Sequence, residues 1–211
     1  MVFVVKGRTI AEAWEKSMIL LLLRGKFVPS QRGAMAKELM NVIIQVDKPH
    51  EEPRISTKYP NRDVLYEYLK ERPETSIIRG QIEHVTNILS DAWFSRRAVI
   101  SLWSTELMDL DFPFCIIAVQ FMIREQKLNM TAFLRSNDAW NYALADMILL
   151  TDLQRDVAKR LKVACGSYTH HAVSYHIYDY DYDLAMESFS DYITSYSLLS
   201  VASSSDSLKK A

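Results

Sequence analysis

Two apolar runs separated by only four polar residues constrain most tightly what this chain can fold into. Cys115 to Ile123 and Leu128 to Leu134 are rich in β-branched and other apolar residues, and Arg124-Glu125-Gln126-Lys127 joins them. Such runs around a short polar link predict an antiparallel hairpin. A third run, Ser167 to Tyr178, alternates in a similar way and predicts another strand.

Helical signals lie on both sides of these strands. Thr9-Ile10-Ala11-Glu12 has the form of a capping box, and the apolar run from Ala11 to Leu23 that follows it ends at Gly25. The spacing of apolar residues predicts a long buried helix over Trp140 to Leu161. Further helices are expected over residues 62–71, 81–89 and 180–198.

The length of the chain allows one well-buried domain. With 211 residues, of which 49% are hydrophobic, it is too short for two ordinary domains. We expect a single domain over residues 1–201. Residues 202–211 are rich in serine and lysine and are expected to form a disordered tail.

Charge and cysteine content argue against several classes of protein. The 25 basic and 26 acidic residues give a formal net charge of -1, which does not favour nucleic acid or an anionic membrane as a partner. The longest apolar run, Met18 to Leu23, is too short to span a bilayer. Two cysteines, Cys115 and Cys165, without a signal peptide indicate a cytoplasmic protein with free thiols.

Spacings counted from Cys115 and from Asp138 resemble the pattern of the thymidylate synthase family. They run from Cys115 to Gln120, from Cys115 to Arg135-Ser136, from Asp138 to Asp146, and from Asp138 to His176-Ile177-Tyr178. Two further segments that match the family are Ser95-Arg96-Arg97 and, more loosely, Glu38-Leu39.

The resemblance implies an α+β fold in which helices flank a mixed sheet and one sheet face packs against a second copy of the chain. It also implies an enzyme that uses 5,10-methylenetetrahydrofolate and a pyrimidine nucleoside monophosphate. Cys115 would add to C6 of the base, because thiolate addition makes C5 nucleophilic toward the methylene group of the folate. Glu38 would organise water and protons as the general base.

By the same resemblance, a set of arginines would bind the phosphate, since forked guanidinium groups match its oxygens. The expected phosphate ligands are Arg96, Arg97, Arg135, Ser136 and, more loosely, Arg32. Arg96 and Arg97 would reach the nucleotide of the partner subunit. Because neighbouring residues on a strand point to opposite faces, only one of the two is expected to touch the phosphate directly.

Two residues near the end of the third strand would hold the sugar. His176 and Tyr178 are two apart, which places both side chains on one face of a strand. The resemblance assigns them to the 3′-hydroxyl, and it places Asp138 among the substrate-binding residues. A metal site at His170, His171 and His176 is the competing interpretation, and the opposite directions of adjacent strand residues argue against it.

Position 146 decides which base is expected. Thymidylate synthases have an asparagine there that reads uracil, whereas this chain has Asp146, the residue of the family's cytosine-reading branch, the nucleotide 5-hydroxymethylases. A carboxylate can accept from the cytosine amino group and from a protonated N3. The prediction is therefore a homodimeric enzyme that hydroxymethylates C5 of CMP or dCMP, with Asp146 acting beside Cys115 and Glu38.

Other interpretations stay open. Cys115 could be an ordinary core cysteine, and Asp146 could be an acid on the surface of a helix. The chain could also be a compact thymidylate synthase that methylates dUMP. A third possibility is a catalytically silent relative that binds a nucleotide without docking folate.

Overall fold

A seven-stranded mixed sheet forms the centre of the computed structural model, which describes residues 1–194 except residues 32, 64, 72–73 and 106–112. The strands are β1 (Phe3–Gly7), β2 (Lys26–Pro29), β3 (Met35–Val46), β4 (Val99–Ser101), β5 (Ile116–Arg124), β6 (Lys127–Asp138) and β7 (Ala164–Tyr178). They are ordered β1-β3-β7-β6-β5-β4, and β2 pairs with residues 35–38 of β3. β6 and β7 run parallel to each other, whereas β3 runs antiparallel to β7.

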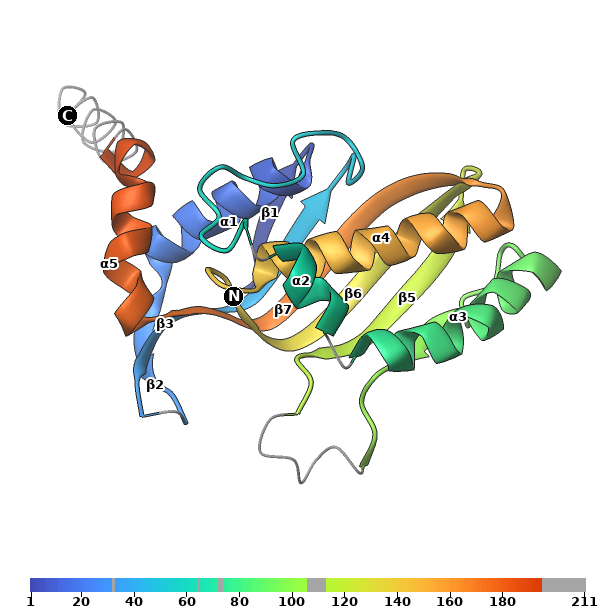
Figure 1. The fold of residues 1–211 in the computed structure, drawn as a ribbon, viewed down its shortest axis with the longest axis horizontal. Helices are drawn as coiled ribbons and strands as arrows, with labels where there is room; N and C mark the ends of the chain where they lie inside the picture. The colour runs from blue at the N-terminus through green and yellow to red at the C-terminus, as the bar shows by residue number, and fades with distance from the viewer. Residues whose placement is uncertain (32, 64, 72–73, 106–112, 195–211) are drawn as a thin grey trace, which may run out of the picture.

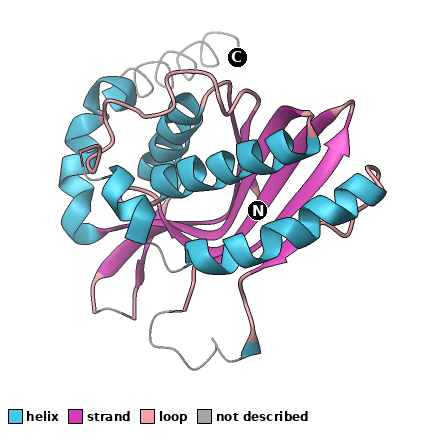
Figure 2. Ribbon diagram, turned by 45° about the vertical axis from the view of Figure 1, so that its right-hand side comes forward, coloured by secondary structure: helices cyan, strands magenta, loops and turns pink. Residues whose placement is uncertain are grey.

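The helices gather on one side of this sheet. They are α1 (Ile10–Arg24), α2 (Leu65–Glu71), α3 (Glu74–Asp91), α4 (Ala143–Leu161) and α5 (Asp179–Ser188). Figure 1 shows α1, α3 and α4 lying across one face of the sheet, and they stay on that side in the turned view of Figure 2. The mixed sheet with flanking helices confirms the predicted α+β class. Within the described ranges, no helix combines the length and apolar content needed to cross a bilayer.

Local sequence signals explain where two of the elements begin and end. The predicted Thr9 cap is confirmed at α1, where the Glu12 N–H donates to Thr9 Oγ1, and Glu12 reaches back one residue further, accepting from the Arg8 N–H. The predicted hairpin is also confirmed, since β5 and β6 pair antiparallel. Glu125 and Gln126 form its turn with positive φ angles of 51° and 60°, as a two-residue hairpin turn requires.

Aromatic packing fixes the segment that precedes α4. The Trp14 ring of α1 stacks on Trp140 with ring centroids 6.1 Å apart, and its indole N–H donates to the carbonyl of Ala139 at 2.8 Å. Phe189, just after α5, packs against both tryptophans. Because residues 138–142 carry the chain from β6 into α4, this cluster also holds the adjoining site residues in place.

Several predicted boundaries are wrong. α3 begins at Glu74 rather than residue 81, α2 begins at Leu65, and α4 begins only at Ala143, because residues 139–142 form a turn. The last part of the predicted final helix, residues 195–198, and the predicted tail lie outside the described residues.

The prediction that Arg96 and Arg97 lie on a strand is also wrong. β4 starts at Val99, and both arginines belong to the bend before it. The Ser95 hydroxyl accepts from the Arg97 N–H at 3.1 Å, which holds this bend in place of strand pairing. The argument that the two arginine side chains face opposite ways therefore does not apply.

Candidate active site

Three titratable side chains form a row across the centre of the sheet. His176 of β7 pairs with Glu38 of β3 on one side and with Asp138 of β6 on the other. Paired residues on neighbouring strands place their side chains on the same face of a sheet. Asp138 and His176 are each 8% exposed, and Glu38 is half-buried. The fold thus brings together three predicted site residues that lie far apart in the sequence.

Ser174 connects two members of this row. Its hydroxyl donates to Glu38 Oε1 at 2.5 Å, and its oxygen lies 3.3 Å from Nδ1 of His176. Because the hydroxyl proton points toward Glu38, the oxygen accepts from Nδ1 of His176, which therefore carries a proton. The sequence analysis missed Ser174, although its position two residues before His176 on one strand was an available signal.

Asp138 also closes the turn that leads into α4. Its Oδ1 accepts from the backbone N–H groups of Trp140 and Asn141, at 3.1 Å and 3.0 Å, and its Oδ2 accepts from the Asn141 amide at 3.1 Å. Burial raises the pKa of Asp138, and the hydrogen bonds from Asn141 and the proximity of His176 oppose this rise only in part. Asp138 therefore fixes the entry to α4 as well as lying in the row.

Cys115 lies half-buried directly before β5, and its backbone is joined to β6. Its carbonyl accepts from the Arg135 N–H at 2.9 Å. The Arg135 guanidinium turns back toward the same loop, donating to the carbonyls of the two residues before Cys115, and lies 5.9 Å from the ring centroid of Trp103. The guanidinium is thus fixed against the loop that precedes Cys115. Cys115 precedes β5, and β5 pairs with β6, the strand that carries both Arg135 and Asp138. Cys115 therefore lies one strand away from the row.

The other predicted ligands are placed unevenly. Ser136 pairs with Ser174 across β6 and β7, and the Tyr178 ring meets that of His176 edge-on with centroids 5.1 Å apart. These two residues therefore adjoin the row. Arg96 and Arg97 have exposed side chains in the bend before β4. Arg32 lies outside the described residues.

Asp146 is buried in the first turn of α4, with 1% of its surface exposed. Its Oδ2 accepts from Nδ2 of Asn137 at 2.7 Å, and Oδ1 of Asn137 faces Nε2 of His170 at 2.9 Å. Buried acids are paired or hydrogen-bonded, so the interpretation of Asp146 as a surface acid is wrong. The sequence analysis missed the contribution of Asn137, whose place between Ser136 and Asp138 in the matched motif was a signal.

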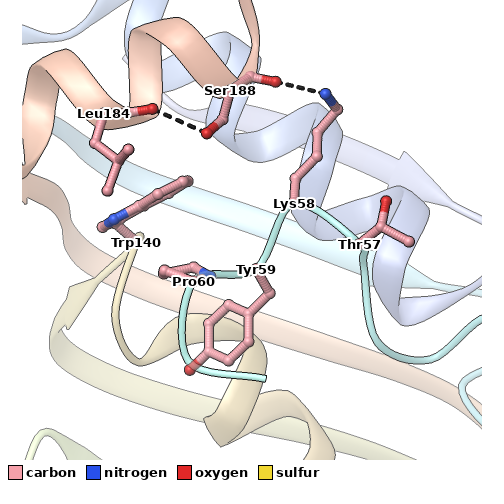
Figure 3. Close-up of a pocket in the computed structure, with 7 residues that line it drawn as sticks. All are labelled: Thr57, Lys58, Tyr59, Pro60, Trp140, Leu184 and Ser188. Carbon is pink, nitrogen blue, oxygen red and sulfur yellow. Dashed lines mark hydrogen bonds between the residues drawn. The ribbon is translucent and has the colours of Figure 1, made fainter. Parts of the chain in front are cut away.

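A pocket of about 560 Å³ lies next to the turn before α4 (Figure 3). Its lining residues are Thr57, Lys58, Tyr59, Pro60, Trp140, Leu184 and Ser188. The Tyr59 hydroxyl donates to the carbonyl of Asn141, the residue that binds Asp138, and Lys58 Nζ donates to the carbonyl of Ser188. A lysine beside an aromatic and aliphatic lining suits a flat ring system that carries a carboxylate. The pocket thus offers one cation beside an aromatic and aliphatic lining.

The histidines that were considered as metal ligands take other roles. His170 is bonded to Tyr168 and Asn137, and burial lowers its pKa to about 3. His171 packs against Phe133 with ring centroids 5.8 Å apart. In the part of the chain that the structure describes, no group of three or more His, Cys, Asp or Glu side chains is arranged to hold a metal ion.

Comparisons with known proteins agree on one family. The model of the family described as thymidylate synthase matches residues 56–210. A protein of Methanocaldococcus jannaschii is 30% identical over 208 residues, covering 84% of this chain and 93% of that protein. Proteins of Methanosarcina mazei and Methanococcoides burtonii are 25% and 27% identical over 202 residues, covering 86% and 85% of this chain and 92% and 91% of their own lengths. All three are provisionally named as thymidylate synthases.

The matched residues include Cys115, Asp146, the pocket and α2, whereas Glu38 lies outside them. The family takes its one-carbon unit from 5,10-methylenetetrahydrofolate. Because the family model covers well over half of the chain, the protein belongs to the thymidylate synthase family.

Proposed function

We propose that the protein transfers a one-carbon unit from 5,10-methylenetetrahydrofolate to C5 of CMP or dCMP and that water completes the reaction, giving the 5-hydroxymethyl nucleotide. The observation that carries this proposal is the buried carboxylate of Asp146, which already accepts a hydrogen bond from Asn137. Cytosine offers an amino donor, whereas uracil offers O4 as an acceptor. A buried acceptor therefore complements cytosine and repels uracil.

Cys115 is the proposed nucleophile. Its thiolate adds to C6 of the base, and the electron pair of the C5–C6 double bond moves to C5. Arg135, whose guanidinium is anchored on the loop before Cys115, supports the thiolate electrostatically and lies within the phosphate-binding set. When bound, the folate supplies the methylene group that becomes attached to C5.

The row of side chains manages protons and water in this proposal. Glu38 accepts a hydrogen bond from Ser174 and serves as general base for removal of the C5 proton and for activation of water. His176 and Tyr178 hold the sugar 3′-hydroxyl. Ser174, whose oxygen lies 3.3 Å from Nδ1 of His176, orients the ring for this contact.

We further propose that two copies of the chain complete the site. The sheet carries exposed apolar side chains on six of its strands, among them Val4, Phe27, Met40, Val99, Phe133 and Val173. Exposed apolar side chains spread across a sheet favour packing against another surface. In such a homodimer, Arg96 and Arg97, whose side chains are exposed, would reach the partner's nucleotide phosphate together with Arg135 and Ser136.

The pocket beside Asp138 is the proposed docking place for the folate. Lys58 offers a cation for a glutamate carboxylate, and Tyr59, Pro60 and Leu184 offer an aromatic and apolar lining for a ring. Trp140 belongs to both the pocket and the turn that Asp138 closes. In this arrangement the folate would lie on one side of Asp138 and the nucleotide on the other.

Tritium release tests the function. The protein is incubated with 5,10-methylenetetrahydrofolate and C5-tritiated CMP, dCMP or dUMP, and tritium in water is counted. Release from a cytosine nucleotide that Cys115→Ala abolishes and Cys165→Ala retains would support the proposal, because Cys165 is the matched second thiol. Release from dUMP alone would favour a methylating enzyme, and nucleotide binding without release would favour a silent relative.

A further inference from the structure

Four buried side chains form one chain of hydrogen bonds that ends on Asp146. The Tyr168 hydroxyl lies 2.8 Å from Nδ1 of His170, Nε2 of His170 lies 2.9 Å from Oδ1 of Asn137, and Nδ2 of Asn137 donates to Asp146 at 2.7 Å. None of the four residues is more than 1% exposed. The chain therefore joins β7, β6 and α4 without access to bulk water.

The two contacts of Asn137 determine which atoms in this chain of hydrogen bonds donate and which accept. Asn137 turns its amide N–H to Asp146 and its carbonyl to His170, so Nε2 of His170 must carry a proton. Nδ1 of that ring then accepts from the Tyr168 hydroxyl. Each residue thus donates to the next one toward Asp146. The buried imidazole of His170 makes both of its hydrogen bonds in the neutral form.

We propose that Asn137 and His170 are positioning residues that set the base specificity by keeping Asp146 a hydrogen-bond acceptor toward the pyrimidine. This inference rests on the proposed cytosine-reading function. A protonated Asp146 could donate to O4 of uracil, as an amide does, whereas a carboxylate can only accept. The Asn137 amide, held in place by His170 and through it by Tyr168, donates to the Asp146 carboxylate. This hydrogen bond stabilises the charged form and orients the second carboxylate oxygen. The position of Asp146 in the first turn of α4 adds the favourable helix dipole.

Paired substitutions at His170 separate this role from simple packing. In His170→Gln the side-chain amide can place an N–H where Nε2 stands, whereas His170→Leu removes the donor. Equilibrium affinities for dCMP and dUMP are measured by calorimetry, and the ratio of the two is compared among variants. We expect His170→Leu to lower the preference for dCMP roughly tenfold or more, and His170→Gln to stay within about threefold of the parent protein.

Two further variants make the test independent of folding losses. Asn137→Ala removes the donor to Asp146 directly and should lower the same ratio even if His170→Leu does not fold. Thr151→Val deletes another buried hydroxyl on α4, one that donates to the carbonyl of Met147 and accepts from Arg54, and should leave the ratio unchanged. Thermal unfolding of every variant shows whether it is folded under the conditions of the binding measurement.

The possible results distinguish the two proposals. Equal losses of dCMP and dUMP affinity in His170→Leu and Asn137→Ala, with the ratio unchanged, would overturn the positioning role while leaving the cytosine preference of the parent protein intact. A parent protein that prefers dUMP would overturn the proposed function and this inference with it. A falling ratio that His170→Gln restores would support both.

Discussion

The Ser174 hydroxyl donates a 2.5 Å hydrogen bond to the Glu38 carboxylate, although 136 residues separate the two in the sequence. β3 and β7 pair antiparallel, and their register sets Glu38 opposite His176, two residues beyond Ser174. The position of the proposed general base is thus held from the neighbouring strand. Its acceptor capacity is partly occupied before any substrate enters.

Removing the Ser174 hydroxyl should slow the reaction without preventing nucleotide binding. Ser174→Ala leaves Glu38 without its donor, and a hydrogen bond to a charged group contributes about 1.5–3 kcal/mol. We expect the rate of tritium release to fall by roughly ten- to a hundredfold, with nucleotide affinity within a few fold of the parent protein. Ser174→Thr keeps the hydroxyl and should restore most of the rate. Equal rates in Ser174→Ala and the parent would contradict this assignment.

Glu38 and Glu67 form a matched pair for locating the general base. Glu38 lies in the row beside His176 but outside the residues that the family model matches, whereas Glu67 of α2 lies inside them. On the structural placement we expect Glu38→Gln to lower turnover by about a hundredfold or more, as the loss of a general base does. Turnover that survives Glu38→Gln and is lost in Glu67→Gln would assign the base to α2 instead.

Asp146→Asn should reverse the base preference. The amide can accept from N3–H of uracil and donate to O4, and Asn137 can still donate to the new amide oxygen. Competition between dCMP and dUMP in single-turnover tritium release measures the change directly. An unchanged preference for dCMP would show that residues other than Asp146 read the base.

Lys58→Met tests the folate pocket. Loss of the ammonium of the half-buried Lys58 should raise KM for the folate several fold while KM for the nucleotide stays constant, because one charge contact near the surface contributes about 1 kcal/mol or less. Lys48→Met is the control, since Lys48 is exposed and does not line the pocket. A KM for folate that both variants raise equally, or neither raises, would place the folate elsewhere.

Sequence patterns predict the parts of this site that depend on neighbouring residues in the chain. The hairpin at Glu125 and Gln126 follows from alternation around a short polar link, which also places Cys115 directly before β5 and Asp138 at the end of β6. The bend at Arg96 was not predicted. It forms because the Ser95 hydroxyl accepts from the Arg97 N–H, a local contact that competes with strand pairing.

Contacts across strands that are distant in sequence could not be predicted. Ser174 meets Glu38, and His170 meets Asn137, only because the sheet places β7 between β3 and β6. Strand order depends on long-range packing and cannot be read from a short stretch of sequence. The contacts that Ser174 and Asn137 make were therefore missed, whereas the motif spacings depend only on positions along the chain.

Buried neutral histidine should make the fold sensitive to acid. Burial lowers the pKa of His170 to about 3, and burial with the charges of Arg155 and Arg54 lowers that of His50 to about 4, from 6.5. Below pH 6.5 these two histidines bind protons in the unfolded chain but not in the folded chain, so their contribution to stability falls as pH drops from 6.5 toward 3. The fully buried His170 contributes up to about 1.4 kcal/mol per pH unit within this window, and the half-buried His50 contributes less.

Urea unfolding between pH 3.5 and 7.5 measures this slope. His170→Gln, which cannot take up a proton, should flatten the profile. A slope that is the same in the variant and the parent protein would show that His170 does not cause the acid sensitivity.

The parallel register of β6 and β7 sets Asp138 beside His176 and Ser136 beside Ser174. Because strand side chains alternate between faces, deleting or inserting one residue within the last third of either strand would turn these groups to the opposite side of the sheet. The turn after α4, where Lys162 takes a left-handed conformation with φ of 55°, lies at the far end of β7 and can change length without disturbing this alignment. Insertions and deletions are therefore tolerated at the end of the β6–β7 pair near Lys162. The end that carries Asp138 and His176 can change only by substitution.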